Sequence, residues 1–158
     1  MRVAYTNKRH VGEKFAVKII SYKVMFYREE IENEINIHKK LSDKQTGCVP
    51  RFYSVCKAPN TENVLVRTEL CDQNLLQFLK EKGGFLPENE ARMIMKQILK
   101  GVRLMKKMEI LHCDLKLENI LVKDEKEFKI CNFGASRRLR PGESTKHNIL
   151  TLENAAPE

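Results

Sequence analysis

The sequence contains no tryptophan, and only 7% of its 158 residues are aromatic. It has no run of 18 or more apolar residues, so we expect no transmembrane helix and no membrane partner. The first ten residues, MRVAYTNKRH, lack the apolar stretch of a secretory signal peptide. The hydrophobic content of 42% is sufficient for one core in a chain of this length.

The cysteine spacing of a metal site or a disulfide framework is also missing. The cysteines are odd in number, no two are spaced CxxC, and no histidine lies near enough to complete a zinc-ligand pattern. They are Cys48, Cys56, Cys71, Cys113 and Cys131. We expect reduced thiols in a cytoplasmic, intracellular protein.

The basic residues do not form a nucleic-acid-binding pattern. The net charge is +8 and the pI is about 9.3, but the basic residues are scattered and have no aromatic residues between them. A solvated basic surface is therefore favoured, and no nucleic-acid partner is expected. A weak preference for anionic partners is the open alternative.

Short apolar runs predict strands, and apolar residues that repeat every three or four positions predict helices. The predicted strands are Arg2 to Tyr5, Phe15 to Ile20, Phe52 to Cys56, Asn63 to Glu69, Ile120 to Val122 and Phe128 to Ile130. The predicted helices are roughly Phe26 to Leu41, Leu75 to Lys80 and Pro87 to about Glu109, the last with proline in its first turn. We expect a hairpin from the first two strands and a surface loop from Asn132 onward. This order indicates an α+β fold.

Two charged residues lie where apolar residues are expected. Lys18 lies inside an apolar strand, and Glu34 shares a helix face with Ile31, Ile35 and His38. A carboxylate on an inward face needs a cationic partner, because an unpaired buried charge is costly. The alternative is that Glu34 lies at the edge of this face and reaches water.

The helix after Pro87 is apolar on two sides. One stripe contains Ala91, Met95, Ile98, Val102 and Met105, and a second contains Met93, Leu104 and Met108. A helix with two apolar sides is normally buried on both.

Five segments in this order resemble the eukaryotic protein kinase family, of the serine/threonine type. They are FAVKII, EIENEINIHKKL, HCDLKLENILV, KICNFGAS and NAAPE. The resemblance implies a protein-kinase-like fold with an antiparallel, β-rich N-lobe and the first part of a helical C-lobe. The chain would then be a partial kinase domain over residues 1–158, with the N-lobe at about 1–70 and the C-lobe, through the APE motif, at about 71–158.

The resemblance also implies ATP and Mg²⁺ as cofactors and assigns residues to phosphoryl transfer. Lys18 would hold the α- and β-phosphates, and Glu34 would orient Lys18. Asp114 would accept the proton of the substrate hydroxyl, and Lys116 would reach the γ-phosphate. Asn119 would be a metal ligand. Lys116 in DLKLEN is typical of serine/threonine kinases.

The adenine site follows from the same resemblance. The hinge would consist of Glu69, Leu70 and Cys71, whose backbone groups would pair with adenine. Ala16 and Leu121 would cover the two faces of the ring, although core packing is an equal alternative for both. Thr68 would be the gatekeeper. His112 and Phe133 match the internal hydrophobic spine of the family, with His38 and Phe52 as partners.

The sequence departs from the family pattern in its loops and at its ends. The glycine-rich loop over the phosphates is absent, because Met1 falls where that loop should have ended. The chain stops at Glu158, whereas the family's helical lobe continues, so we expect the helix after Pro87 to expose an apolar surface. Cys113 replaces an arginine that in the family pairs with a phosphate on the activation segment. A buried, inert cysteine is favoured there over a reactive thiol.

A further departure affects the metal. Asn132 stands at the position of the DFG aspartate, which is a principal magnesium ligand in the family. One pair of unit charges 4 Å apart contributes roughly 4 kcal/mol at an effective dielectric of 20. A loss of that size in the transition state is about a thousandfold in rate. We therefore expect Asn132 to be a weak neutral ligand for Mg²⁺.

Three functions are compatible with the sequence. The first is a serine/threonine kinase that is weak or inactive as given and that acts on a protein substrate. The second is a pseudokinase module that binds and regulates a protein partner. The third is a gene fragment that does not fold.

Overall fold

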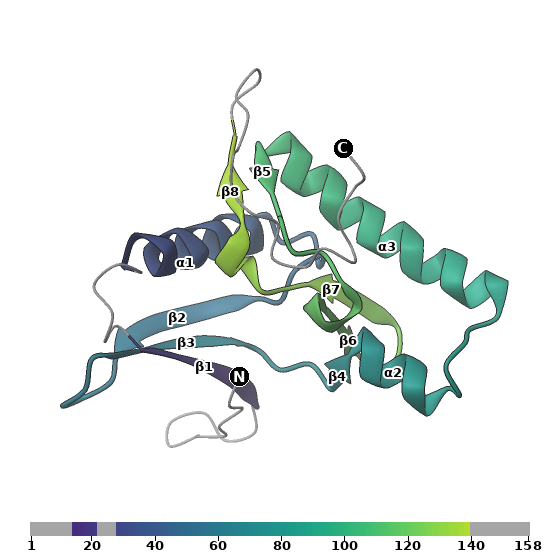
Figure 1. Ribbon diagram of the computed structural model, residues 1–158, viewed down its shortest axis with the longest axis horizontal. Helices are drawn as coiled ribbons and strands as arrows, with labels where there is room; N and C mark the ends of the chain where they lie inside the picture. Colours follow the sequence, from purple (N-terminus) through teal and green to yellow (C-terminus); the bar gives the residue numbers. More distant parts are fainter. Residues whose placement is uncertain (1–13, 22–27, 140–158) are drawn as a thin grey trace.

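The structure is a computed structural model that describes residues 14–21 and 28–139 (Figure 1). The predicted strand Arg2 to Tyr5, the hairpin it would form and the NAAPE motif lie outside the described residues. All of the strand pairings described are antiparallel, and helices flank the sheets. The expected α+β class is therefore confirmed.

The N-terminal sheet has the order β1-β3-β2. Its strands are β1 (Phe15–Ser21), β3 (Asn63–Glu69) and β2 (Phe52–Lys57), which confirms the predicted strands. Lys18 pairs with Val66 across β1 and β3, so its position in the sheet is fixed by the apolar pattern of both strands. The helix α1 (Arg28–Ser42) lies over this sheet.

The second part is built around the sheet β4-β6-β7. Its strands are β4 (Gln73–Asn74), β6 (Ile120–Lys123) and β7 (Glu127–Ile130). The helices α2 (Leu75–Glu81) and α3 (Glu88–Lys107) lie beside it, and a two-stranded sheet joins β5 (Ile110–Leu111) to β8 (Arg137–Arg138). Two 3-10 turns, η2 (Leu117–Asn119) and η3 (Phe133–Ala135), complete it. The predicted helix at Leu75 and the predicted strands near 120 and 128 are confirmed.

A hydrophobic core joins the helices to the second sheet. Leu41 of α1, Phe78 of α2 and Phe133 of η3 belong to one buried cluster with Ile130 of β7. Gly101 allows α3 to approach this sheet, because a Cβ at residue 101 would meet Cδ1 of Ile130 at 2.7 Å. Burial on this scale is the main stabilising term of the fold.

The helices differ from the sequence expectations in their buried faces. On α1, the predicted residue Ile31 is buried, but so are Ile37 and Leu41, whereas the predicted residue Ile35 is only partly buried. On α3, the predicted residue Met105 is buried, and parts of both predicted stripes pack against the core. Ile94 and Gly101 are buried as well, although neither belonged to a predicted stripe.

The apolar surface expected on α3 is present. Met93, Met95 and Leu99 are 45%, 53% and 44% exposed, so part of each predicted stripe faces solvent. Pro87 immediately precedes the helix instead of lying in its first turn. None of the described helices combines the length and the apolar character needed to cross a bilayer.

Residues 133–139, the described part of the segment after Asn132, differ from the expected surface loop. They form the turn η3 and the strand β8, in which Arg137 pairs with Leu111. Two-residue strands have no period that a sequence pattern could reveal. This correction matters because the segment contacts α1, as described below.

Candidate functional site

A cavity of about 550 Å³ lies between the N-terminal sheet, α1 and the second sheet. Of the predicted site residues, those that line it are Ala16, Lys18, Glu34, Glu69, Cys71, Asn119, Leu121 and Asn132. Thr68 and Leu70 line it as well, whereas Asp114 and Lys116 are not lining residues. Ala16 and Leu121 therefore border a cavity large enough for a small ligand.

Lys18 and Glu34 form an ion pair between β1 and α1. Their side chains are 32% and 15% exposed. Glu34 is therefore not at the solvent edge of its helix, and the expected cationic partner is Lys18. The Lys18 ammonium also lies 3.4 Å from Oδ1 of Asn132, which brings three separate motifs together at the cavity wall.

Asp114 lies in the loop between β5 and η2 and is 8% exposed. Its Oδ1 pairs with Nζ of Lys116 at 3.1 Å, and its Oδ2 accepts a hydrogen bond from Nδ2 of Asn119 at 2.9 Å. The same Nδ2 donates to the backbone carbonyl of Asp114 at 2.7 Å. These contacts fix the carboxylate of Asp114 in one orientation, as a proton acceptor for a positioned hydroxyl requires.

Asn132 and Asn119 interact directly across the cavity floor. Nδ2 of Asn132 donates to Oδ1 of Asn119 at 3.0 Å. Asn132 has a φ of 65°, a left-handed conformation that asparagine tolerates better than most residues. The backbone geometry at residue 132 is thus compatible with asparagine, and the amide is used as a donor.

These groups are a poor match for Mg²⁺. The ion prefers charged carboxylate oxygens, but Asn119 and Asn132 offer neutral amide oxygens that already accept hydrogen bonds. Both oxygens of Asp114 are engaged as well. Among the described residues, no group of three or more histidine, cysteine or acidic side chains could hold a metal. The described donor set therefore fits Mg²⁺ poorly, and weak metal binding at Asn132 stays a prediction.

The carboxylate of Glu69 belongs to a charged cluster. It accepts hydrogen bonds from Nζ of Lys123 at 2.7 Å, from Nζ of Lys129 at 2.9 Å and from the backbone of Arg51 at 3.0 Å. Burial opposes ionisation, but these donors lower the pKa of Glu69 to about 2. The cluster joins the end of β3 to the β6–β7 hairpin, and nothing in the sequence pattern indicated it.

The thiols near the cavity are not activated. Burial raises the pKa of Cys71 and the pKa of Cys131 to about 12 each. Burial also raises the pKa of Cys113, although Arg137 acts in the opposite direction. All five cysteines are free, and these three remain protonated at neutral pH.

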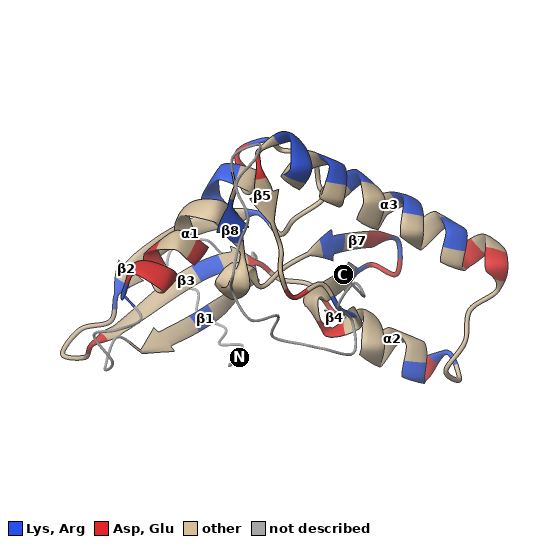
Figure 2. Ribbon diagram, turned by 45° about the horizontal axis from the view of Figure 1, so that its top comes forward, with Lys and Arg blue, Asp and Glu red and all other residues tan. Residues whose placement is uncertain are grey.

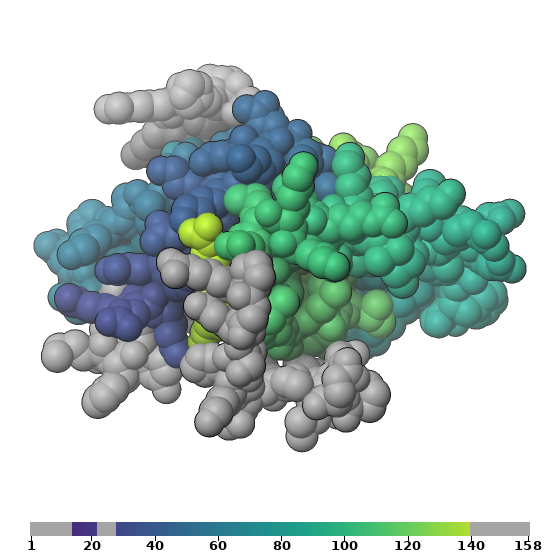
Figure 3. Space-filling model, turned by 90° about the horizontal axis from the view of Figure 1, so that it is seen from above, coloured from purple at the N-terminus to yellow at the C-terminus, as the bar shows by residue number. Residues whose placement is uncertain are grey.

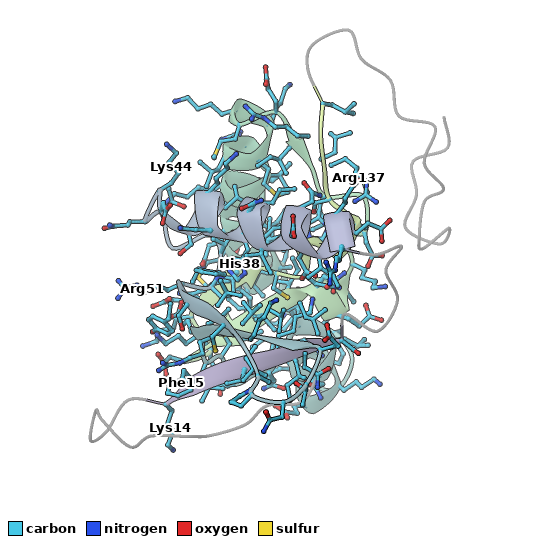
Figure 4. All side chains as sticks on the ribbon, turned by 90° about the vertical axis from the view of Figure 1, so that its left-hand side faces the viewer. Lys14, Phe15, His38, Lys44, Arg51 and Arg137 are labelled. Atoms are coloured by element: carbon cyan, nitrogen blue, oxygen red, sulfur yellow. The ribbon has the colours of Figure 1, made fainter. Side chains whose placement is uncertain are left out.

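Four rings connect α1 to the loop that carries Asp114. His38 lies 5.5 Å from Phe52 and 5.3 Å from Phe133, and Phe133 lies 5.6 Å from His112. Figure 4 shows His38 between α1 and the N-terminal sheet. The expected contacts among these four residues are confirmed, and the series links both halves of the site.

One family model and three known proteins match this chain. Residues 2–158 match the family model of the protein kinase domain. Myosin light chain kinase family member 4 of Homo sapiens is 38% identical over 149 residues, which cover 93% of this chain and 37% of that protein. Serine/threonine-protein kinase PLK2 of Mus musculus is 32% identical over 143 residues, or 89% of this chain and 20% of that protein. Myosin light chain kinase 3 of Rattus norvegicus is 34% identical over 154 residues, or 96% and 19%. The chain thus spans less than two fifths of each relative.

Proposed function

The chain belongs to the protein kinase family, of the serine/threonine type, and from this premise we propose that it transfers the γ-phosphate of ATP slowly to serine or threonine hydroxyls of a protein substrate. Its N-lobe would comprise about residues 1–70, and its C-lobe would begin at about residue 71. A cytoplasmic location accords with its reduced thiols.

The observation that carries this proposal is that the site contains two ion pairs, Lys18 with Glu34 and Lys116 with Asp114. Lys18, held by Glu34, presents an ammonium to the cavity, where it would bind the α- and β-phosphates. Asp114, held by Asn119, would take the proton of the attacking hydroxyl, and Lys116 would neutralise charge that develops on the γ-phosphate. Bound ATP supplies the phosphoryl group.

Adenine would occupy the part of the cavity between Ala16 and Leu121, against the backbone of Glu69 and Cys71. The Glu69 side chain is committed to its lysine cluster, so only backbone groups of the hinge are offered to the base. Recognition by backbone groups explains why a cysteine is tolerated at residue 71.

Asn132 limits the rate in this proposal. A neutral amide replaces the carboxylate that would hold Mg²⁺, the ion that would balance the negative phosphate charge. The loss of even one such charge interaction, roughly 4 kcal/mol at 4 Å and an effective dielectric of 20, slows transfer about a thousandfold. The side chain also hydrogen-bonds to Asn119, the other expected metal ligand.

That same hydrogen bond favours a second candidate, a pseudokinase that binds nucleotide and regulates a protein partner. The side chains of Asn119 and Asn132 hydrogen-bond directly to each other, so neither needs a metal to hold it in place. The regulated partner would then respond to nucleotide binding and not to phosphoryl transfer.

The two candidates are separated by Asn132→Asp in the full chain. We expect this variant to transfer phosphate from ATP and Mg²⁺ to a generic serine/threonine substrate such as casein at least about tenfold faster than the wild type, because it restores a charged metal ligand. Radiolabel transfer is the measurement.

Two controls make the result specific. Asn89→Asp adds the same charge at an exposed position and should leave the rate unchanged. Asn132→Asp combined with Asp114→Asn should be inactive, which excludes a contaminating kinase. If Asn132→Asp binds ATP but neither it nor the wild type transfers phosphate, the weak-kinase proposal is wrong and the pseudokinase candidate replaces it.

A further inference from the structure

One face of α1 contacts residues 134–137, which follow Asn132 in the chain. Glu30 lies near Arg137, with 3.7 Å between Oε1 and Nη2, and Asn33 reaches Ser136. Glu34 lies beside Gly134, where an added Cβ would be 3.5 Å from Oε2. These positions follow the helical spacing of three and four residues, so a single face makes all of the contacts.

The strongest of these contacts is at Ser136, which is fully buried. Nδ2 of Asn33 donates to the carbonyl of Ser136 at 2.8 Å, and the hydroxyl of Ser136 donates to the carbonyl of His112 at 3.1 Å. Ser136 therefore joins α1 to the loop that contains Asp114. Figure 3 shows the yellow end of this segment at the surface, between the blue of α1 and the green of the chain near residue 110.

The connection continues from His112 to Asp114. The backbone N–H of Asp114 donates to Nδ1 of His112 at 3.3 Å, so Nε2 carries the proton and donates to the carbonyl of Cys131 at 3.0 Å. The chain of contacts thus runs from Asn33, which precedes Glu34, to the backbone of Asp114. None of its links involves a residue that contacts phosphate in the proposed mechanism.

Arg137 adds a more exposed contact. Its Nη1 donates to the carbonyl of Ser136 at 2.9 Å, while its Nη2 faces Glu30. Figure 4 places Arg137 near the end of α1 that is farther from Lys44. The side chains of Glu30 and Arg137 are 49% and 25% exposed, so this ion pair is screened by salt and is weaker than the buried junction.

We propose that Asn33 and Ser136 are positioning residues that couple the placement of Glu34, and hence of Lys18, to the placement of Asp114. Movement of α1 away from the cavity would break the hydrogen bond from Asn33 to the Ser136 carbonyl and so release Ser136, whose hydroxyl supports the His112 carbonyl. The placement of one end of the site would then depend on the placement of the other. The consequence for nucleotide binding rests on the proposed function, whereas the coupling itself does not.

The coupling is tested by hydrogen exchange on the full chain without nucleotide, followed by mass spectrometry. For Asn33→Ala we expect at least threefold faster exchange in both α1 and residues 110–116, because about 1 kcal/mol, or a factor of about five, is lost with one hydrogen bond. Asn36→Ala, at an exposed position of the same helix, should change neither region. Faster exchange in α1 alone would overturn the proposal.

A double-mutant cycle with Ser136→Ala gives a second readout. If both side chains act through one junction, the double variant should accelerate exchange by less than the product of the single effects. Independent, multiplicative effects would contradict a shared junction. This result does not depend on whether Asn33→Ala alone changes the thermal stability.

The functional consequence is measured separately, as the affinity for ATP. Asn33→Ala should bind ATP about fivefold more weakly than the wild type, and Asn36→Ala should bind it equally well. Failure of the wild type to bind ATP would overturn the proposed function, while the exchange experiments would still decide the coupling. An unchanged affinity in Asn33→Ala, with a wild type that binds, would overturn the positioning role.

Discussion

At the scale of single residues, the surroundings of His38 determine both how its ring packs and whether the ring carries a charge. Its ring packs between Phe52 and Phe133, and its Nε2 lies 2.8 Å from the carbonyl of Pro50. Burial lowers the pKa of His38, although the contact with Pro50 and the charge of Glu34 act in the opposite direction. The neutral form is therefore the one that the fold accommodates.

The lowered pKa predicts a stability change with pH. The unfolded chain takes up a proton at His38 near the ordinary value of 6.5, whereas the folded chain resists it. Stability is thus fully present above pH 6.5 and falls as the pH is lowered through that value towards the folded-state pKa. His38→Phe should show a smaller drop in unfolding midpoint between pH 7.5 and 5.5 than the wild type, as measured by thermal denaturation.

The remaining dependence should come partly from His112, whose pKa is also lowered by burial. Equal pH dependence in the wild type and His38→Phe would mean that His38 is protonated without penalty in the folded chain.

Individual site residues could be predicted from the sequence where their position in a recognisable pattern indicated their role. The lysine in an apolar strand and the carboxylate on an inward helix face predicted the Lys18–Glu34 pair, because each charge requires a partner. Asn33 and Ser136 could not be found in this way. Their importance lies in one hydrogen bond from the side chain of Asn33 to the backbone carbonyl of Ser136, 103 residues away in sequence, and any side chain with a suitable donor could have made it.

At the scale of elements, the Glu69 cluster holds the N-terminal sheet to the second sheet. Lys129 of β7 is 5% exposed and bonds to both Glu69 and Glu127. Burial disfavours its charge, but these carboxylates raise the pKa of Lys129, so it stays charged. The cluster fixes the end of β3, from which the hinge begins.

Removing this lysine should destabilise the protein strongly. Lys129→Met leaves Glu69 with Lys123 as its remaining cationic partner, and we expect a loss of about 3 kcal/mol in the free energy of unfolding, at the low end for breaking a buried pair. Denaturant unfolding is the measurement. Lys82→Met, which breaks the exposed pair with Glu125, is the matched control and should have no measurable effect. Similar losses in both variants would mean that the cluster contributes no more than a surface pair.

Elements with a clear period were predicted well from sequence, and those without one were not. β3 has the predicted bounds, because its short run of apolar residues, Val64 to Val66, stands out from the polar residues on either side. The buried face of α3 was predicted only in part: Met105 is buried as expected, whereas Gly101 was missed because it allows a close approach without contributing an apolar side chain. β8 was missed because its pairing with β5 depends on residues 26 positions away in sequence, from Leu111 to Arg137.

For the whole molecule, many of the basic residues lie along α3 and not at the candidate site. Figure 2 shows lysine and arginine along α3, on the opposite side of the molecule from much of the N-terminal sheet. The site charges balance instead, since Lys18 faces Glu34 and Lys116 faces Asp114. Binding of the ATP phosphates would therefore depend on where Lys18 and Lys116 are placed, and not on an excess of positive charge among these four groups.

The central claim, that the cavity holds ATP, is tested most directly by the thermal unfolding midpoint with and without ATP. A ligand that binds only the folded chain raises this midpoint. We predict that ATP alone raises the wild-type midpoint, that Mg²⁺ adds little to the shift unless Asn132 is changed to aspartate, and that Lys18→Ala abolishes it. A cooperative wild-type transition that does not move at millimolar ATP, with or without Mg²⁺, would contradict the account.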